Sequence, residues 1–281
     1  MVGGKMTKRQ RIFGYFIIVL STVIFTCFAF AGCGDNPQEE SGDRYEKPTA
    51  SLTYKREGNT YTVTGMTGEE TVLVIPSEYN GLPVTKIQAD YGNGAFASKD
   101  ITKVILPDTM NEIGQNSFYN SKKLHTVEIG DGSRLTTIGN NAFSGNSALI
   151  EFYIPASMVN LGESVFNNCG AIERFTVAEG NAEFTATNGH LIKKNGASLI
   201  RGANNGVIPD GVKVICKAAF RKSTATKLTI PASVESIENY VIDDSDIQEI
   251  IYQGSEESWE QITKAKLWNL GKTDITIEFI S

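Results

Sequence analysis

The segment ITKVILPDTMNEIGQNSF, residues 101–118, decides the fold. Val104 and Leu106 stand two positions apart, so an extended strand points both side chains to one side. The β-branched content of this stretch favours a strand, and the proline that follows ends it because proline lacks a backbone donor. A second block then places Ile113 five positions before Phe118. One apolar strand followed by one apolar turn is therefore the unit that we expect to repeat along the chain.

The strand block recurs along the chain. The matching segments are ITKVILP from Ile101, LHTVEIG from Leu124, LIEFYIP from Leu149, IERFTVA from Ile172, ATKLTIP from Ala225 and IQEIIYQ from Ile247. Their spacings are 23, 25, 23, 53 and 22 residues. The long interval is one repeat plus an insertion of about 30 residues, which repeat proteins accept as a loop on one face.

The second block recurs in the same register. It reads IGQNSF at 113–118, IGNNAF at 138–143, LGESVF at 161–166 and ICKAAF at 215–220. One such repeat cannot bury its own apolar residues, whereas stacked neighbours can. The periodicity therefore predicts a β-rich solenoid with about 22–25 residues per repeat, a parallel sheet on one face and an inserted β-hairpin.

The pattern L-x-x-I-x-I-P followed by I-G-x-x-A-F resembles the BspA-like class of bacterial leucine-rich repeats. The segment 61–87 is similar to the opening of such domains, 181–200 resembles the hairpin that they often carry, and the ending IYQGSEESWEQI resembles their last repeat. The resemblance covers the chain from about Tyr54 to Ile280. It implies the right-handed coil of a leucine-rich repeat domain and a role in protein or host-surface interaction.

We predict three parts. Residues 1–32 form a signal peptide, 33–50 form a flexible polar tether, and 51–281 form the repeat domain. Within the repeat domain, a hairpin insertion is expected at about 179–202, with Asn195-Gly196 as a turn, and a C-terminal cap is expected at about 254–281.

The N-terminus carries an export signal. Residues 1–11 are polar and basic, and 12–32 run without a charge. The junction Phe30-Ala31-Gly32-Cys33 resembles the bacterial lipobox, with Phe30 in place of the usual leucine, so Cys33 is the predicted lipidation site. Because the apolar run also approaches the length of a membrane span, an uncleaved N-terminal helix is the alternative anchor. Both interpretations place the body at the cell surface, on the extracellular side of the membrane.

Charge and composition exclude several classes of function. Residues 33–281 hold 22 basic and 32 acidic side chains, a net charge of −10, which argues against nucleic acid as a partner. Two histidines and four cysteines supply no metal-site spacing, and we expect no metal and no cofactor. We also expect no catalytic residue and no enzyme activity: His125 and His190 are interpreted as exposed, and the carboxylates around Trp259 and after Ile242 as solvated surface.

The remaining function is recognition. Outward-facing residues alternate with the buried ones on each strand, and the candidate ligand-binding residues are Lys103, Ile105, Glu151, Tyr153 and Arg174. Tyr153 and Arg174 are the expected anchors, since tyrosine and arginine are frequent at binding hot spots. We therefore expect a surface-anchored recognition or adhesion protein whose partner is a protein or a surface glycoconjugate. The alternatives are a carbohydrate- or solute-binding lipoprotein, an accessory scaffold for cell-envelope enzymes, and a sheet face that is merely solvated.

Overall fold

A computed structural model describes residues 47–90 and 92–280 of the chain. The segment Glu46–Ser281 forms a compact unit with its own buried core. The predicted signal peptide, most of the predicted tether and Cys33 lie outside the described residues. In the described part, no helix has the length and apolar character that crossing a membrane requires.

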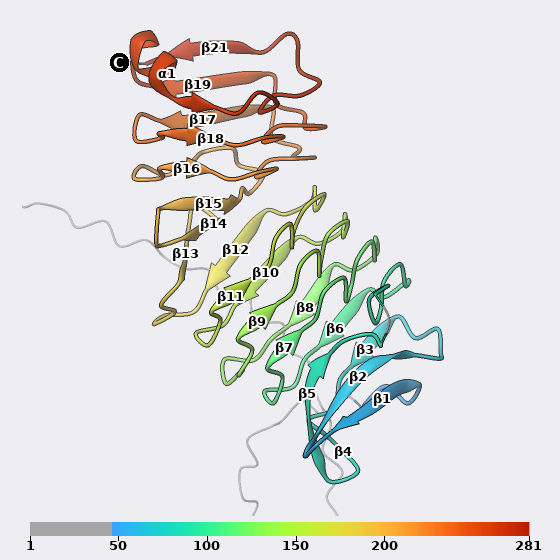
Figure 1. The fold of residues 1–281 in the computed structure, drawn as a ribbon. Coiled ribbons are helices and arrows are strands. Elements are labelled where there is room, and N and C mark those ends of the chain that lie inside the picture. Colours follow the sequence, from blue (N-terminus) through green and yellow to red (C-terminus); the bar gives the residue numbers. More distant parts are fainter. Residues whose placement is uncertain (1–46, 91, 281) are drawn as a thin grey trace, which may run out of the picture. The chain divides into compact units, whose positions relative to one another are not determined.

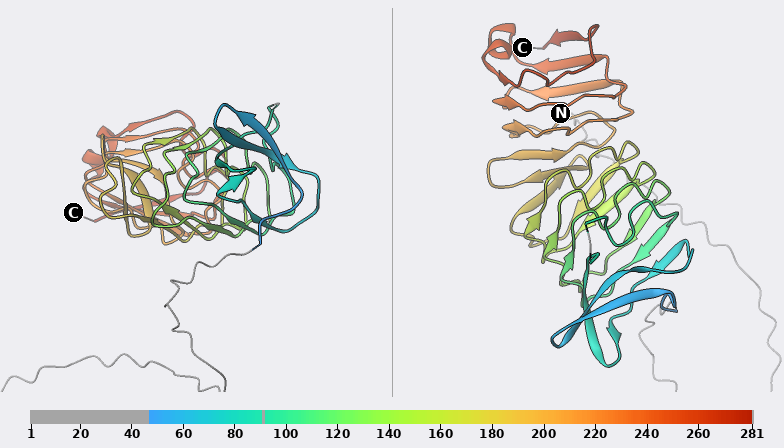
Figure 2. Two further views of the ribbon diagram at one scale, coloured as in Figure 1. Left: turned by 90° about the horizontal axis from the view of Figure 1, so that it is seen from below. Right: turned by 45° about the vertical axis from the view of Figure 1, so that its right-hand side comes forward.

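The chain winds as a β-solenoid, and one wall of the coil carries the longer strands (Figures 1 and 2). These strands are β3 (Val72–Val74), β6 (Lys103–Ile105), β8 (Thr126–Glu128), β10 (Glu151–Ile154), β12 (Arg174–Val177), β17 (Lys227–Pro231), β19 (Glu249–Gln253) and β21 (Thr276–Phe279). They form three parallel sheets in the orders β3-β6-β8, β10-β12 and β17-β19-β21. The predicted solenoid is confirmed, and β3 and β21 add a turn before the first and after the last of the six recognised repeats.

A second wall carries two-residue strands after the longer β5, and in four of its turns these come from the block that ends in phenylalanine. They are β5 (Leu82–Ile87), β7 (Glu112–Ile113), β9 (Thr137–Ile138), β11 (Asn160–Leu161), β16 (Val214–Ile215), β18 (Ser236–Ile237) and β20 (Thr263–Lys264). The strands β1 (Leu52–Glu57), β2 (Thr60–Met66) and β4 (Glu78–Tyr79) close the N-terminal end of this wall. The sequence pattern predicts a parallel sheet on one face, and the structure has parallel pairing on two.

The apolar columns meet inside the coil. Phe118 and Phe143 stack with ring centroids 5.2 Å apart, and Phe96 and Phe166 extend the stack on either side, at 5.3 and 6.0 Å. All four rings are buried. Each turn therefore covers the apolar face of the next, which is the source of stability in a repeat fold.

The insertion contains three antiparallel strands, β13 (Phe184–Thr187), β14 (His190–Lys193) and β15 (Ser198–Arg201). Two hairpins thus share β14. The tighter turn is Asn188-Gly189, where φ values of 53° and 78° match the two-residue type I′ connection. Asn195-Gly196 lies in the longer loop between β14 and β15, as the sequence suggests.

The last turn is covered by the helix α1 (Glu256–Gln261), which Ser255 caps through its side chain. Trp259 of this helix is buried, and Trp268 packs against it with ring centroids 6.1 Å apart. The two indoles cover apolar surface that would otherwise face water at the end of the coil.

Candidate functional site

The strand face, defined here as the outward side chains of β6, β8, β10 and β12, holds all five residues predicted to bind ligand. Inward residues such as Val104 and Phe152 are buried, so their neighbours point outward by the alternation of a strand. Ile105 and Tyr153 are half-buried, whereas Glu151 and Arg174 are exposed. The structure brings Glu151, Tyr153 and Arg174 together on paired strands and places Lys103 and Ile105 two strands away, in another sheet.

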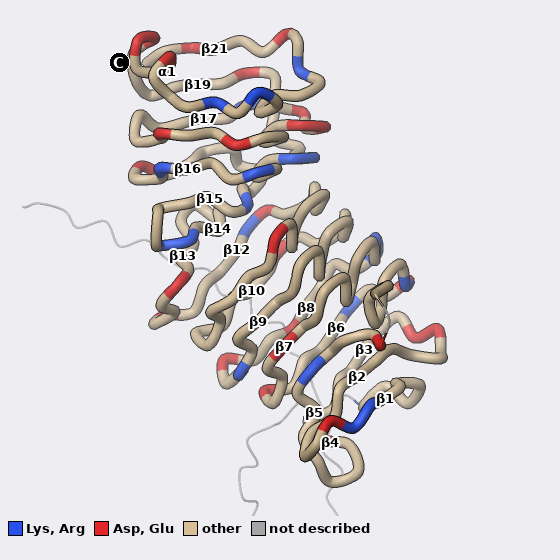
Figure 3. The backbone as a smooth tube through the Cα atoms, viewed as in Figure 1, with Lys and Arg blue, Asp and Glu red and all other residues tan. Residues whose placement is uncertain are grey.

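Charges on this face pair across neighbouring strands. Lys103 lies 3.0 Å from Glu128, and the Nε of Arg174 donates to Glu151 over 2.8 Å. Exposed ion pairs of this kind add at most about 1 kcal/mol, so they set the charge pattern more than the stability. Acidic and basic residues are interspersed along the body rather than gathered by sign (Figure 3). Such a pattern orients a partner more than it attracts one.

Tyr153 and Arg174 each contact a different residue. The hydroxyl of Tyr153 donates to the carboxylate of Asp131 over 3.0 Å, and burial together with this hydrogen bond raises the pKa of Tyr153. Tyr153 lies opposite Thr176 in the sheet, and Arg174 lies opposite Glu151. The two expected anchors are therefore diagonal neighbours on one face rather than a directly opposed pair.

A shallow pocket of about 260 Å³, which the sequence pattern does not predict, opens beside Arg174. Its lining includes Ile150, which is 46% exposed, and Glu173. It lies where β8 and β10 belong to separate sheets. Its lining residues lie at the starts of β8, β10 and β12, whereas Gly130-Asp131-Gly132, where the repeat lacks its proline, follows the end of β8.

Three tyrosines form an aromatic cluster at the N-terminal end of the coil. Tyr54 and Tyr79 stack with centroids 3.8 Å apart, and Tyr61 meets Tyr79 edge-on at 5.0 Å. Tyr79 is 38% exposed, and burial raises the pKa of Tyr54 to about 12. These residues precede the regular repeats, so no periodicity in the sequence brings them together.

The histidines lie in different environments. His125 is exposed just before β8, and its ring Nδ1 lies 2.8 Å from the hydroxyl of Thr126. The expectation of an exposed His190 is wrong, because the side chain is fully buried between backbone groups of the insertion. Its Nε2 lies 2.7 Å from the carbonyl of Val207, and its Nδ1 accepts from the N–H of Ala203. The pairing of both ring nitrogens with backbone makes His190 a structural residue.

The carboxylate clusters are accounted for by local structure. Glu256 and Glu257 lie exposed in the first turn of α1, where they complement the helix dipole. Asp243 and Asp244 both pair with Arg221, at 3.1 and 3.4 Å. No group of three or more His, Cys, Asp or Glu side chains in the described residues is arranged to hold a metal ion.

The two cysteines of the described region are free thiols. Cys169 is buried and Cys216 is half-buried. Burial raises the pKa of each to about 11, which keeps both protonated and weakly nucleophilic at neutral pH.

The fold and the strand face define a leucine-rich repeat scaffold, a class of non-enzymatic repeat proteins that present a regular surface for interaction. The family model of the BspA type leucine rich repeat region matches residues 89–188 and 201–278 with six copies. The chain therefore belongs to the BspA-type leucine-rich repeat family, as the sequence motifs indicate.

Several solved structures are similar to this chain, and the first of those named here supports the same fold. A leucine-rich repeat protein from Eubacterium ventriosum is 18% identical, with a TM-score of 0.54 over 82% of this chain and 70% of that chain. The pneumococcal vaccine antigen PcpA is 16% identical, with a TM-score of 0.48 over 84% and 88% of the two chains. The leucine-rich repeat protein of T. pallidum is 21% identical, with a TM-score of 0.47 over 79% and 86%. No curated protein sequence matches this chain.

Proposed function

We propose that this protein is a cell-surface-anchored recognition protein whose strand face binds a protein ligand. The observation that supports this most directly is half-buried Tyr153 on the same face as exposed Arg174, which lines a shallow pocket together with exposed Ile150. Aromatic and arginine side chains beside a small hollow are the usual anchors of protein interfaces. The paired charges on either side of them supply register rather than affinity.

Binding is tested with the purified protein on protein and glycan arrays, followed by a Tyr153→Ala, Arg174→Ala double variant. Loss of two hot-spot anchors weakens binding by about 100-fold or more, since each costs about 2 kcal/mol or more. The matched control is Tyr119→Ala, Arg134→Ala, because both residues are exposed and lie outside the strand face. If the double variant keeps its melting temperature and binds as tightly as wild type, the strand face is not the site.

Anchoring is assigned to Cys33, on the junction Ala31-Gly32-Cys33 behind a basic and apolar leader. Metabolic labelling with palmitate is expected to mark the wild-type protein and to fail with Cys33→Ala. Equal labelling of both, or a mature protein that still begins before Ile12, would instead support retention of the apolar segment as the anchor.

A surface glycoconjugate is the second candidate ligand, and the cluster of Tyr54, Tyr61 and Tyr79 favours it. Tyrosine offers an apolar ring for stacking and a hydroxyl for hydrogen bonding, and the ring of Tyr79 is partly exposed. Tyr79→Ala is expected to abolish glycan-array signals while leaving protein-array signals unchanged. Glycan-array signals that Tyr79→Ala leaves unchanged would exclude the tyrosine cluster as the glycan site.

A further inference from the structure

Hydrogen bonds pass regularly from turn to turn along the second wall. In six of the described turns, the carbonyl of the inward aliphatic residue accepts a hydrogen bond from the backbone N–H of a residue in the next turn. The pairs are Ile87 with Gly114, Ile113 with Gly139, Ile138 with Gly162, Leu199 with Cys216, Ile215 with Glu238 and Ile237 with Ala265, at 2.7 to 3.0 Å. Leu161 occupies the same position in its turn, and within the described chain its carbonyl has no such partner.

The backbone of Leu161 faces an open edge. Asn160 and Gly162 donate their N–H groups to β9, to the carbonyls of Thr136 and Ile138, over 2.9 and 2.8 Å. Successive residues of a strand direct their backbone groups to opposite sides, so the N–H and C=O of Leu161 point away from β9. In the described chain β11 pairs with β9 alone. The N–H donor and the C=O acceptor of Leu161 are thus left unpaired within the described residues, at the spacing at which a parallel strand would bond to them.

Arg201 connects the two parts of the coil that the insertion separates, on the side where the turns follow the short strands. Its guanidinium donates to the carbonyls of Cys169, Ala218 and Arg221, each at 2.9 Å, and thereby joins the turns before and after the insertion. No comparable side chain of the described region hydrogen-bonds to Leu161. Where the insertion takes the place of a regular turn, Arg201 therefore bridges the neighbouring turns on one side of the coil, and the backbone of Leu161 is left without a neighbouring strand of the described chain on the other.

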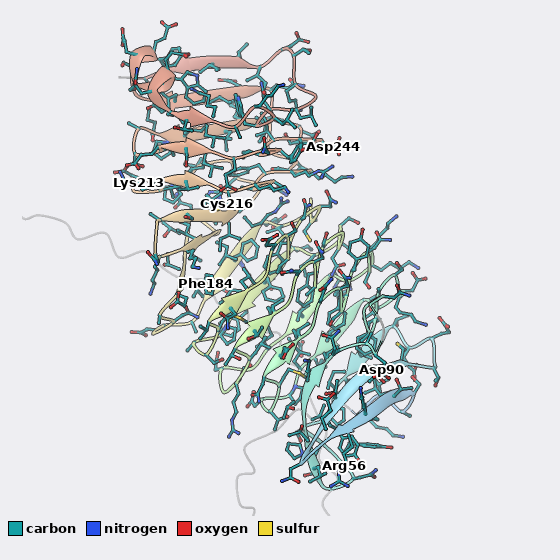
Figure 4. All side chains as sticks on the ribbon, in the orientation of Figure 1. Arg56, Asp90, Phe184, Lys213, Cys216 and Asp244 are labelled. Atoms are coloured by element: carbon teal, nitrogen blue, oxygen red, sulfur yellow. The ribbon has the colours of Figure 1, made fainter. Side chains whose placement is uncertain are left out.

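Two adjoining cavities lie along the open edge, with volumes of about 390 and 290 Å³. Both are lined by Leu161, Gly162 and Ile200. Phe184 of β13 lines the smaller cavity and Cys216, after β16, lines the larger one; both are labelled in Figure 4. The volume of the larger cavity lies within the range of pockets that hold small ligands.

We propose that the open edge of β11 binds an extended segment of a partner protein as an added parallel strand, with an aliphatic residue followed by glycine at its centre. A peptide backbone is the ligand that supplies an acceptor and a donor at the spacing of Leu161. An aliphatic residue is required because Leu161 and Leu199 hold this column on either side of the gap, with Ile138 and Ile215 one turn beyond them. The site lies on a different wall from the strand face, so its test and that of the proposed function are independent.

The glycine follows from close approach of the backbones. A Cβ at Gly139 would lie 2.6 Å from the backbone nitrogen of Gln115, and one at Gly162 would lie 2.5 Å from that of Asn140. An added strand would stack on Gly162 in the same way, which favours glycine, as in the turns before the insertion; the turns after it hold Cys216, Glu238 and Ala265 at this position. The exposed charged residues that line the larger cavity are Glu163, Glu238 and Lys217, and the excess of one carboxylate favours a basic residue after the glycine.

The probe is the fluorescent peptide SRLTTIGKN, which is residues 133–141 of this chain with lysine in place of Asn140. In the ladder, the N–H of its glycine donates to the carbonyl of Leu161, whereas the N–H of its isoleucine points away. N-methylation of the glycine is therefore expected to weaken binding to the full-length protein by about tenfold or more, since it removes the bond and adds a clash. N-methylation of the isoleucine, the matched control, is expected to change the Kd by less than about threefold. Glutamate in place of the lysine is expected to weaken binding.

A protein variant tests the same edge. Leu161→Pro removes the outward N–H, and proline is tolerated at a sheet edge. Its control, Leu161→Ala, shortens the side chain but keeps the N–H, so Leu161→Pro is expected to lose peptide binding by a larger factor. Bound peptide is also expected to slow alkylation of Cys216 in wild type, followed residue by residue by mass spectrometry, and to leave Cys169 unchanged.

Three results would overturn the proposal. The first is absence of peptide binding to the wild-type protein, and the second is equal binding of the two N-methylated peptides, which needs no folded variant. The third is a dimer in sedimentation that Leu161→Pro dissociates, because the occupant would then be a second copy of this chain.

Discussion

His190 shows how the insertion is fixed by single contacts. Its ring is fully buried, with Nδ1 accepting from the backbone of Ala203 at 2.9 Å and with Phe220 edge-on at 5.8 Å. Burial lowers the pKa of His190, because the charged imidazolium is poorly solvated there. Protonation at Nδ1 would also remove the acceptor that Ala203 uses.

The stability of the protein is therefore expected to fall with acid. Because the folded-state pKa lies below the unfolded value, the unfolded chain binds the extra proton first as pH drops below about 6.5. Stability is complete above that pH and declines by up to about 1.4 kcal/mol per pH unit until the folded-state pKa is passed. Urea unfolding between pH 7.5 and 5 measures the slope. His190→Gln is expected to reduce the slope of the unfolding free energy against pH, and the exposed control His125→Gln is expected to leave that slope unchanged. A slope that His190→Gln does not alter would contradict this prediction.

Among the elements, the phenylalanine column carries much of the packing between turns. The ring of Phe166 is 3% exposed and meets Phe152 and Phe175 edge-on, at 4.8 and 5.0 Å. Phe118 lies deeper in the array, stacked between Phe96 and Phe143. Each ring thus contacts residues from both neighbouring turns.

Truncation of a ring in this column is expected to be costly. Phe166→Ala removes a buried aromatic side chain and leaves a void, which costs about 3–5 kcal/mol of unfolding free energy. Equilibrium unfolding in urea measures the loss, with exposed Tyr119→Ala as a control expected to stay within about 0.5 kcal/mol. A loss below about 1 kcal/mol at Phe166 would show that the column does not hold the turns together.

At the scale of the whole molecule, periodicity alone was enough to predict the solenoid and its buried columns. Equivalent positions in stacked turns have equivalent neighbours, so the pattern of buried residues in one repeat predicts that of the others. The strand face followed from the same alternation of side chains. The burial of His190 and the open edge of β11 did not, because both arise where the insertion replaces a turn. The tyrosine cluster and the pocket beside Arg174 likewise depend on departures from the repeat.

The insertion also divides the core, and the last prediction concerns cooperativity. Leu191 belongs to the apolar cluster before the break and Ile192 to the cluster after it, so the continuous strand β14 joins the two. Arg201 adds hydrogen bonds from one side to the other.

We expect one cooperative transition in urea. The chain has two tryptophans, Trp259 and Trp268, and both lie in the C-terminal cluster, so their fluorescence reports on that part while far-UV circular dichroism reports on the whole. The two curves are expected to coincide for wild type and to separate for Arg201→Ala, which removes the side-chain donor shared by three carbonyls. Separate curves in wild type would mean that the arrays on either side of the insertion unfold independently.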